Sequence, residues 1–196
     1  GAPGALTHQL MVAALRKHAI DPATVNFRSV GNSATIFKAL LAGEVDAGFG
    51  ETDVFENQSH YGVHALDDGV LWRELPEFPN QASFTSLDAL HGRRDALVRT
   101  LAAHALLYRL LHSPHSWDSY ATAWASALPD SNAEEGRSQW RFYQQYHPYA
   151  EDLRLSETQV DYMQELNMNM KLQRRALRFG ELADMSLARD AIGMIA

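Results

Sequence analysis

The sequence predicts an α/β fold with a helical C-terminal half, and two patterns lead to this prediction. Over Val25–Asp53, strand-like runs alternate with an amphipathic helix, which is typical of a βαβ unit. From Arg94 onward, apolar residues recur at spacings of three and four, as they do in helices that pack one face against a core. We therefore expect βα units first, helices last, and a boundary near residues 70–90.

The βαβ unit begins with a strand at Val25–Val30 and ends with a second strand at Val45–Phe49. Between them, either Asn32 or Ser33 has the residue type that caps a helix start, and Gly43 suits the left-handed end of that helix. The free backbone N–H groups of a helix start suit an anionic or polar ligand. Capped helices also serve structure alone, so this motif by itself does not define a site.

Shorter elements surround this unit. Helices are expected at Thr7–His18 and within Val54–Tyr61, and short strands at Val63–Leu66, Val70–Leu75 and Gln81–Thr85. The second half is predicted to form helices separated by breaks, several of which contain proline. These helices span Arg94–His112, Ser116–Leu128, Asn132–Tyr146, Ser156–Gln173 and Asp184–Ile195.

The composition excludes several classes of function. The 196 residues are 46% hydrophobic and 21% charged, as in a globular protein of one large domain or two small lobes. The net charge of −7, with acids and bases interspersed, gives no basic patch for nucleic acid. The absence of cysteine excludes disulfides, cysteine–zinc sites and thiol catalysis. No apolar run approaches the roughly 20 residues of a membrane span.

Four stretches, taken in order, resemble a known family. They are Pro3–His8, Val30–Ala47, Phe78–Ser86 with the helix that follows, and Asp184–Ala188. Together they are similar to the substrate-binding proteins of ABC importers of the nitrate, sulfonate and taurine type. The resemblance spans most of the chain, and the order and spacing of the stretches carry it rather than any single motif.

This resemblance implies a type II periplasmic-binding-protein fold, with two lobes and a ligand cleft between them. Residues 1–75 would form a βα ligand-binding lobe, and residues 76–196 a returning segment of the other lobe with the C-terminal helices. The implied partners are a small polar organic ligand and the membrane permease of an ABC transporter, with no cofactor and no bond-making step. The implied location is periplasmic, or extracytoplasmic with a lipid anchor.

Ligand contacts in that family lie at helix starts and at segments that cross the hinge. Carried over to this chain, the contacts are Thr7, His8, Asn32, Ser33, Glu51 and Glu56. A sulfonate, carboxylate or similar anion would use the helix starts. An aminopyrimidine would use a carboxylate such as Glu56, which follows Phe55. The structural alternatives are a capping Thr7, a solvated His8 and a solvated Glu56.

Two other functions compete with solute binding. An enzyme on the same fold, such as a pyrimidine synthase or a decarboxylase, would use His8 or Glu51 as acid or base. The pyrimidine synthases that resemble these binding proteins carry a cysteine-rich motif, however, and this chain has no cysteine. A ligand-sensing module would show the same sequence features as a transport protein.

Nine histidines raise the question of a metal site. His60 and His64 are four residues apart, and His112 and His115 flank a Ser-Pro break. Neither pair has an acidic ligand nearby at helical spacing, so we expect solvated pairs and no metal site. Trp72 lies near the expected lobe boundary and is the tryptophan expected to reach a ligand. The tryptophans expected to pack in the core are Trp117, Trp124 and Trp140.

The sequence also predicts an incomplete fold. In the family, a strand leads into the turn at Pro3, whereas only two residues precede Pro3 here. A parallel sheet that lacks a member leaves an apolar edge open. We therefore expect either a companion chain or missing N-terminal segment, or exposed apolar surface at Val25–Val30 and Val98–Leu111.

Overall fold

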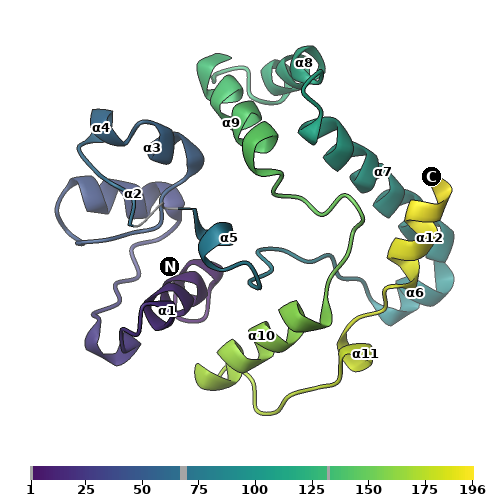
Figure 1. Ribbon diagram of the computed structural model, residues 1–196, viewed down its shortest axis with the longest axis horizontal. Coiled ribbons are helices and arrows are strands. Elements are labelled where there is room, and N and C mark those ends of the chain that lie inside the picture. The colour runs from purple at the N-terminus through teal and green to yellow at the C-terminus, as the bar shows by residue number, and fades with distance from the viewer. Residues whose placement is uncertain (1, 67–69, 132) are drawn as a thin grey trace. The chain divides into compact units, whose positions relative to one another are not determined.

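Helices form all of the regular structure that is described (Figure 1). The computed structural model describes residues 2–66, 70–131 and 133–196, and within these ranges it contains helices and no β-strand. The predicted α/β fold class, and with it the type II periplasmic-binding-protein architecture, is therefore wrong for this structure. The side chain of Trp72 and the expected helix start at Asn132 lie outside the described residues.

The segments predicted as strands are irregular or helical. Val25–Val30 and Val45–Phe49 flank a helix as expected, but neither pairs in a ladder among the described residues. Val70–Leu75 contains α5 (Leu71–Glu74) instead of a strand. The physical reason is that a strand satisfies its backbone groups only against a neighbouring strand, whereas a helix satisfies them within itself. In this loop region, the Arg28 guanidinium donates to the Glu44 carbonyl and links the two extended segments.

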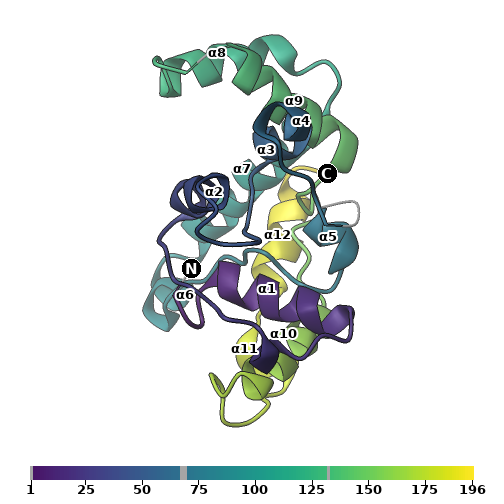
Figure 2. The same ribbon diagram turned by 90° about the vertical axis from the view of Figure 1, so that its left-hand side faces the viewer.

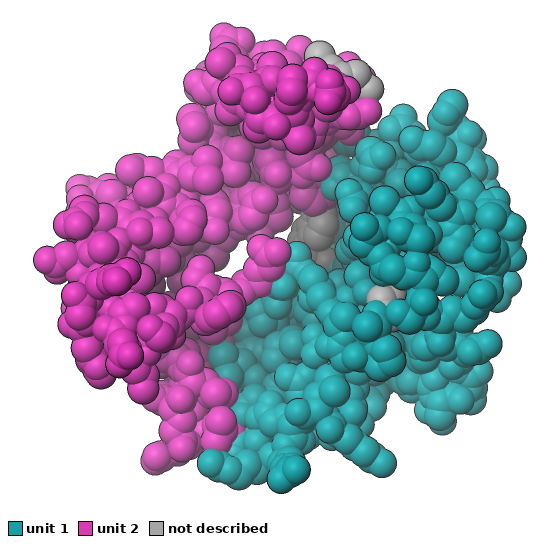
Figure 3. Space-filling model, turned by 180° about the vertical axis from the view of Figure 1, so that it is seen from behind, with its two compact units in different colours: residues 1–80, 158–176 teal, residues 81–157, 177–196 magenta. Residues whose placement is uncertain are grey.

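The chain divides into two compact units, which Figure 3 shows in different colours. Unit 1 comprises residues 1–80 and 158–176, and unit 2 comprises residues 81–157 and 177–196. The chain therefore passes between the units three times along its length. Each unit has a hydrophobic cluster of its own.

Unit 1 is organised around the packing of its first helix. Its core joins Leu10 and Val12 of α1 to Leu75, Phe78 and the α10 residue Leu166. A hydrogen bond of 2.8 Å from the Gln9 side chain to that of Asn167 adds a polar link between the same two helices. The helical elements associated with this unit are α1 (Leu6–Lys17), η1 (Pro22–Thr24), α2 (Ser33–Leu41), α3 (Thr52–Glu56), α4 (Gln58–Tyr61), α5 (Leu71–Glu74) and α10 (Glu157–Asn169).

Unit 2 contains the long helix predicted in the second half. The prediction of Arg94–His112 is confirmed with the same bounds, and the other predicted helices of that half are present with ends that differ by a few residues. The elements of unit 2 are α6 (Leu87–Gly92), α7 (Arg94–His112), α8 (Trp117–Ala127), α9 (Ala133–Tyr146), α11 (Phe179–Leu182) and α12 (Ser186–Met194). None of the described helices is long and apolar enough to cross a membrane.

Two helix pairs hold unit 2 together. The last helix, α12, lies along α7, as Figures 1 and 2 both show. Val98 and Ala102 of α7 are buried there against Leu187 and Ala191 of α12. The bulky and small residues interdigitate, which brings the two helices close together.

The second pair is α8 with α9, and tryptophans form its contact. Trp117 meets Trp140 edge to face at 5.5 Å between ring centroids, and the Trp140 indole N–H donates to Ser116 Oγ at 2.9 Å. Gly136 lies against Trp124, where an added Cβ would come within 3.0 Å of the ring. The three tryptophans are half-buried and pack on neighbouring side chains, whereas the prediction placed them in the core.

Some apolar side chains are exposed within both segments where exposure was expected, although Val98, at the start of the second segment, is buried. Val25 and Phe27 are 38% and 39% exposed in unit 1. On α7, Leu106, Leu107 and Leu110 are 51%, 45% and 45% exposed. Leu110 lies four residues after Leu106 and three after Leu107, so it neighbours both on the helix surface.

Candidate functional site

The predicted contacts Thr7 and His8 lie in the first turn of α1. The helix begins at Leu6 with Ala5 as N-cap and no side-chain cap, so Thr7 is not the capping residue. His8 is half-buried, its Nδ1 accepts the Gly4 backbone N–H at 3.0 Å, and its ring meets Phe27 edge to face. One ring nitrogen of His8 is therefore already used to fix the turn before the helix.

Asn32 is the cap of α2, and Ser33 is the first residue of that helix. The Asn32 side-chain oxygen accepts the Thr35 backbone N–H at 3.0 Å and the Thr35 hydroxyl at 2.9 Å. The sequence allowed either Asn32 or Ser33 as the cap, and in the structure the cap is Asn32. Its side-chain oxygen thus accepts two hydrogen bonds within the protein, although the residue is exposed.

Glu51 and Glu56 lie at opposite ends of the short helix α3. Both are exposed, and Glu51 takes the N-cap position without a side-chain hydrogen bond to the helix. Among the described residues, no direct hydrogen bond joins the start of α1 to Asn32, Ser33 or Glu51. Local hydrogen bonds hold His8 and Asn32, and the convergence of the predicted contacts on one ligand stays a prediction.

A groove in unit 2 is large enough for a small organic molecule. It has a volume of about 590 Å³, within the range of roughly 300–1,000 Å³ that is usual for ligand sites. The segment 152–157, α11 and α12 form its walls. The residues that line it are Asp152, Arg154, Leu155, Ser156, Glu157, Phe179, Met185, Ala188, Arg189 and Ile192.

This groove combines apolar walls with charged side chains. Phe179, Met185 and Ile192 are apolar, while Arg154 and Arg189 each bring an exposed guanidinium. Neither guanidinium makes a hydrogen bond or an ion pair with the described residues. Both therefore keep their donors available for an anion, and a guanidinium can bind a carboxylate or a sulfonate through two parallel hydrogen bonds.

The carboxylates near the groove are held by backbone N–H groups. Asp152 accepts the Arg154 backbone N–H at 3.0 Å. Asp184 accepts the Ser186 backbone N–H at 2.8 Å, and hydrogen bonds from Ser186, with smaller contributions from the charges of Arg94 and Arg189, keep the pKa of Asp184 below its usual value. Asp184 thus remains ionised at neutral pH.

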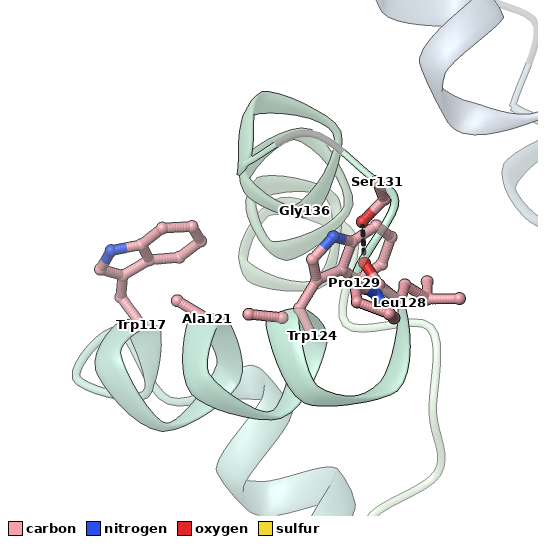
Figure 4. Close-up of a pocket in the computed structure, with 8 residues that line it drawn as sticks. Trp117, Ala121, Trp124, Leu128, Pro129, Ser131 and Gly136 are labelled. Carbon is pink, nitrogen blue, oxygen red and sulfur yellow. Dashed lines mark hydrogen bonds between the residues drawn. The ribbon is translucent and has the colours of Figure 1, made fainter.

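A second cavity lies between α8 and the segment that leads into α9 (Figure 4). Its volume is about 120 Å³, and Trp117, Trp124, Leu128 and Pro129 give it mainly apolar walls. The Ser131 hydroxyl donates to the Leu128 carbonyl at its edge. The cavity is well below the size of an ordinary ligand site, so it is the weaker candidate.

Three potential metal ligands lie together elsewhere in unit 2. His112, His147 and Glu151 each offer a ligand atom, and these atoms all lie within 4.8 Å of one another. His112 Nδ1 and Glu151 Oε1 are 2.7 Å apart, and the rings of His112 and His147 stack with centroids 4.5 Å apart. His147 is exposed, whereas only 3% of the His112 side chain is exposed.

Chain geometry brings these three residues together. His112 ends α7, and His147 directly follows the end of α9 with a φ of 44°, a left-handed conformation. The Gln144 side chain donates to the Leu111 carbonyl and so ties the end of α9 to the end of α7. Tyr149 stacks on Tyr108 at 4.7 Å and anchors the segment that carries Glu151.

Sequence reasoning missed this cluster because it paired His112 with His115. His115 is exposed and lies outside the group. The available signal was His147 and Glu151, four residues apart just after a predicted helix end. Only the packing of α9 against α7 connects that pair to His112.

Comparison with known proteins adds no assignment to these sites. No protein-family model, no curated protein and no solved structure matches the chain.

Proposed function

We propose that this protein is a solute-binding protein that holds a small organic anion in the groove of unit 2. The observation that carries the proposal is the presence of Arg154 and Arg189, both without an ion-pair partner among the described residues, beside the apolar side chains of one groove. The expectation of solute binding comes from the sequence resemblance to importer substrate-binding proteins, whose type II fold this structure does not have. The chemistry required is binding alone, with no bond made or broken.

The groove suits a ligand with an acidic group and a short carbon skeleton. A sulfonate or carboxylate would receive hydrogen bonds from the two guanidinium groups. The carbon skeleton would lie against Phe179 and Ile192, where burial of apolar surface stabilises the complex. Apolar walls combined with a few polar groups are typical of small-molecule sites.

Acidic residues in the groove narrow the ligand class further. Asp152 and Glu157 also line the groove, and a carboxylate next to an anionic ligand is unfavourable unless it is paired. A ligand with an amino group as well as an acidic group would satisfy both kinds of side chain. Among the sulfonates and carboxylates that the resemblance implies, zwitterions are therefore favoured over simple anions.

Delivery to an ABC importer is part of the same proposal. The ligand would be released to the permease unchanged. A ligand-sensing role would use the same binding step.

Calorimetry tests the proposal with three probes: 2-aminoethanesulfonate, propionate and an aminopyrimidine. We expect saturable binding of 2-aminoethanesulfonate to the wild type and weaker binding of propionate. Arg154→Gln and Arg189→Gln should each weaken binding by roughly tenfold or more, since each removes hydrogen bonds to a charged group. Arg99→Gln is the matched control, because Arg99 is an exposed arginine of unit 2 outside the groove.

Three results would contradict the proposal. If neither the sulfonate nor the carboxylate shows saturable binding, the proposed function is wrong. If Arg154→Gln and Arg189→Gln both bind the ligand with wild-type affinity, the groove is not the binding site. Conversion of the ligand to a product, followed by NMR during a long incubation, would place the protein with enzymes such as the pyrimidine synthases or decarboxylases.

A further inference from the structure

We propose that His112, His147 and Glu151 bind a divalent transition-metal ion, with zinc as the best match. The site lies in unit 2, shares no residue with the groove, and goes beyond solute binding. Two imidazoles and one carboxylate form a donor set that zinc commonly uses in proteins. Three protein ligands would leave one position of a tetrahedral ion for water or another small ligand.

The first support is a polar atom that the protein leaves without a partner. His112 Nε2 is buried and makes no hydrogen bond among the described residues, while Nδ1 faces Glu151. An unsatisfied buried polar atom is unfavourable, so the His112–Glu151 pair alone leaves this ring only half satisfied.

The ring nitrogen that binds the ion decides the role of Glu151, because Nδ1 faces Glu151 and Nε2 points away from it. On Nε2 the ion would occupy the unpartnered atom while Nδ1–H donates to Glu151, an arrangement common among metal-bound histidines because the carboxylate fixes the ring. An ion bound to Nδ1 would also be coordinated by the Glu151 carboxylate. Only the second arrangement makes Glu151 a ligand; in the first, Glu151 orients the ring, and His112 and His147 are the protein ligands.

The second support is the spacing of the ligand atoms. Atoms bound to one tetrahedral zinc ion at ordinary bond lengths lie about 3.4 Å apart. The closest pair here is 2.7 Å apart and the three atoms lie within 4.8 Å, so changes in separation of up to about 1.4 Å bring them to that spacing. Exposed His147 can supply most of this movement by rotating its side chain, whereas buried His112 stays fixed.

Charge and surroundings favour the same ion. One carboxylate and two neutral imidazoles carry a net charge of −1, which attracts a divalent cation. The Tyr149 ring stacks on the His112 ring with centroids 6.0 Å apart. Magnesium and calcium prefer oxygen ligands, so a site with two nitrogens should select against them.

Calorimetric titration of the full chain with zinc chloride tests the proposal. We expect one equivalent of zinc to bind with release of protons, since ligands must be deprotonated to coordinate the ion. His147→Ala and Glu151→Gln should each weaken zinc binding by about tenfold or more. Both residues lie at the surface or half-exposed, so these changes are preferable to a substitution at buried His112.

Two controls give the test its specificity. His115→Ala removes an exposed histidine three residues from His112 that lies outside the cluster, and it should bind zinc as the wild type does. Magnesium chloride should give no saturable binding. Circular dichroism of each variant should match the wild type, which separates loss of a ligand from loss of the fold.

The proposal is overturned by any of three results. The wild type could show no saturable zinc binding. Folded His147→Ala could bind zinc as tightly as the wild type. His115→Ala could weaken binding as much as His147→Ala does. None of these results bears on the organic-anion groove, which the calorimetry with organic ligands tests separately.

Discussion

Gly48 lies directly against Ile36, and an added Cβ on Gly48 would come 2.6 Å from Ile36 Cγ2. Ile36 is buried in α2 with 6% of its surface exposed, and its branched side chain has essentially one rotamer available in a helix. The loop after α2 thus needs a residue without a side chain at position 48. This contact fixes the second extended segment of unit 1 against the helix.

Gly48→Ala should therefore destabilise the protein. Overpacking of this kind lowers the free energy of unfolding by about 1–3 kcal/mol. Gly193→Ala is the matched control, because its added Cβ would meet nothing within 4 Å on α12. That change should stabilise by up to about 1 kcal/mol through helix propensity. Urea denaturation of both variants measures the difference, and equal stability would contradict the close contact.

Asn32→Ala should reduce stability through loss of the α2 cap. The expected loss is about 1 kcal/mol in the free energy of unfolding, since the Thr35 backbone N–H loses its acceptor. Asn32→Asp keeps an acceptor and should restore stability. If Asn32 also contacts a ligand, as the sequence predicts, Asn32→Asp should weaken the binding of an anion at wild-type stability. Unchanged affinity in this variant would restrict Asn32 to capping.

Stability should fall as the pH rises above about 10. Burial raises the pKa of Tyr149, with smaller contributions from a hydrogen bond to Tyr143 and nearby phenols, and burial likewise raises the pKa of Tyr120. The folded state therefore holds these protons more tightly than the unfolded state, whose phenols titrate near 10. The stabilisation is complete below that pH and is lost as the pH rises further.

Denaturation at a series of alkaline pH values measures this dependence. Tyr149→Phe removes one of the two phenols and should make the loss of stability with pH less steep. An identical slope in the variant would show that Tyr149 does not contribute. Absorbance of phenolate in the folded wild type should likewise show tyrosines that ionise late.

The exposed leucines of α7 should promote association between chains. Leu106 and Leu107 both neighbour Leu110 on the helix surface, and all three are exposed. Exposed apolar surface is typical of contacts with a second chain. Light scattering should show an average molar mass that increases with protein concentration. The double variant Leu107→Lys, Leu110→Lys should have an average mass closer to that of the monomer. A monomer at every concentration would contradict this expectation and the companion chain it supports.

The second half of the fold was predictable because its signals are local. The spacing of apolar residues and the break at Ser113-Pro114 gave the bounds of α7 from neighbouring residues alone. The start of α2 was predicted in the same way, with either Asn32 or Ser33 as its cap, and the cap is Asn32. Helix hydrogen bonds join residues four apart, so the sequence of one segment carries most of the information.

The strands and the metal-ligand cluster were not predictable in this way. Val25–Val30 has the composition of a strand, but composition does not supply the neighbour that a strand needs. His112 and Glu151 are 39 positions apart, and their meeting depends on how α7 and α9 end beside each other. Both failures concern contacts between distant segments, which a single sequence leaves open.

Hydrogen–deuterium exchange with and without saturating 2-aminoethanesulfonate tests the central claim most directly. The account predicts slower exchange at residues 152–157 and along α12, where the groove lies. Arg189→Gln should abolish this protection at the same ligand concentration, whereas Arg99→Gln should preserve it. Protection confined to the starts of α1 and α2, near Thr7 and Asn32, would contradict the groove and place the ligand at the sequence-predicted contacts.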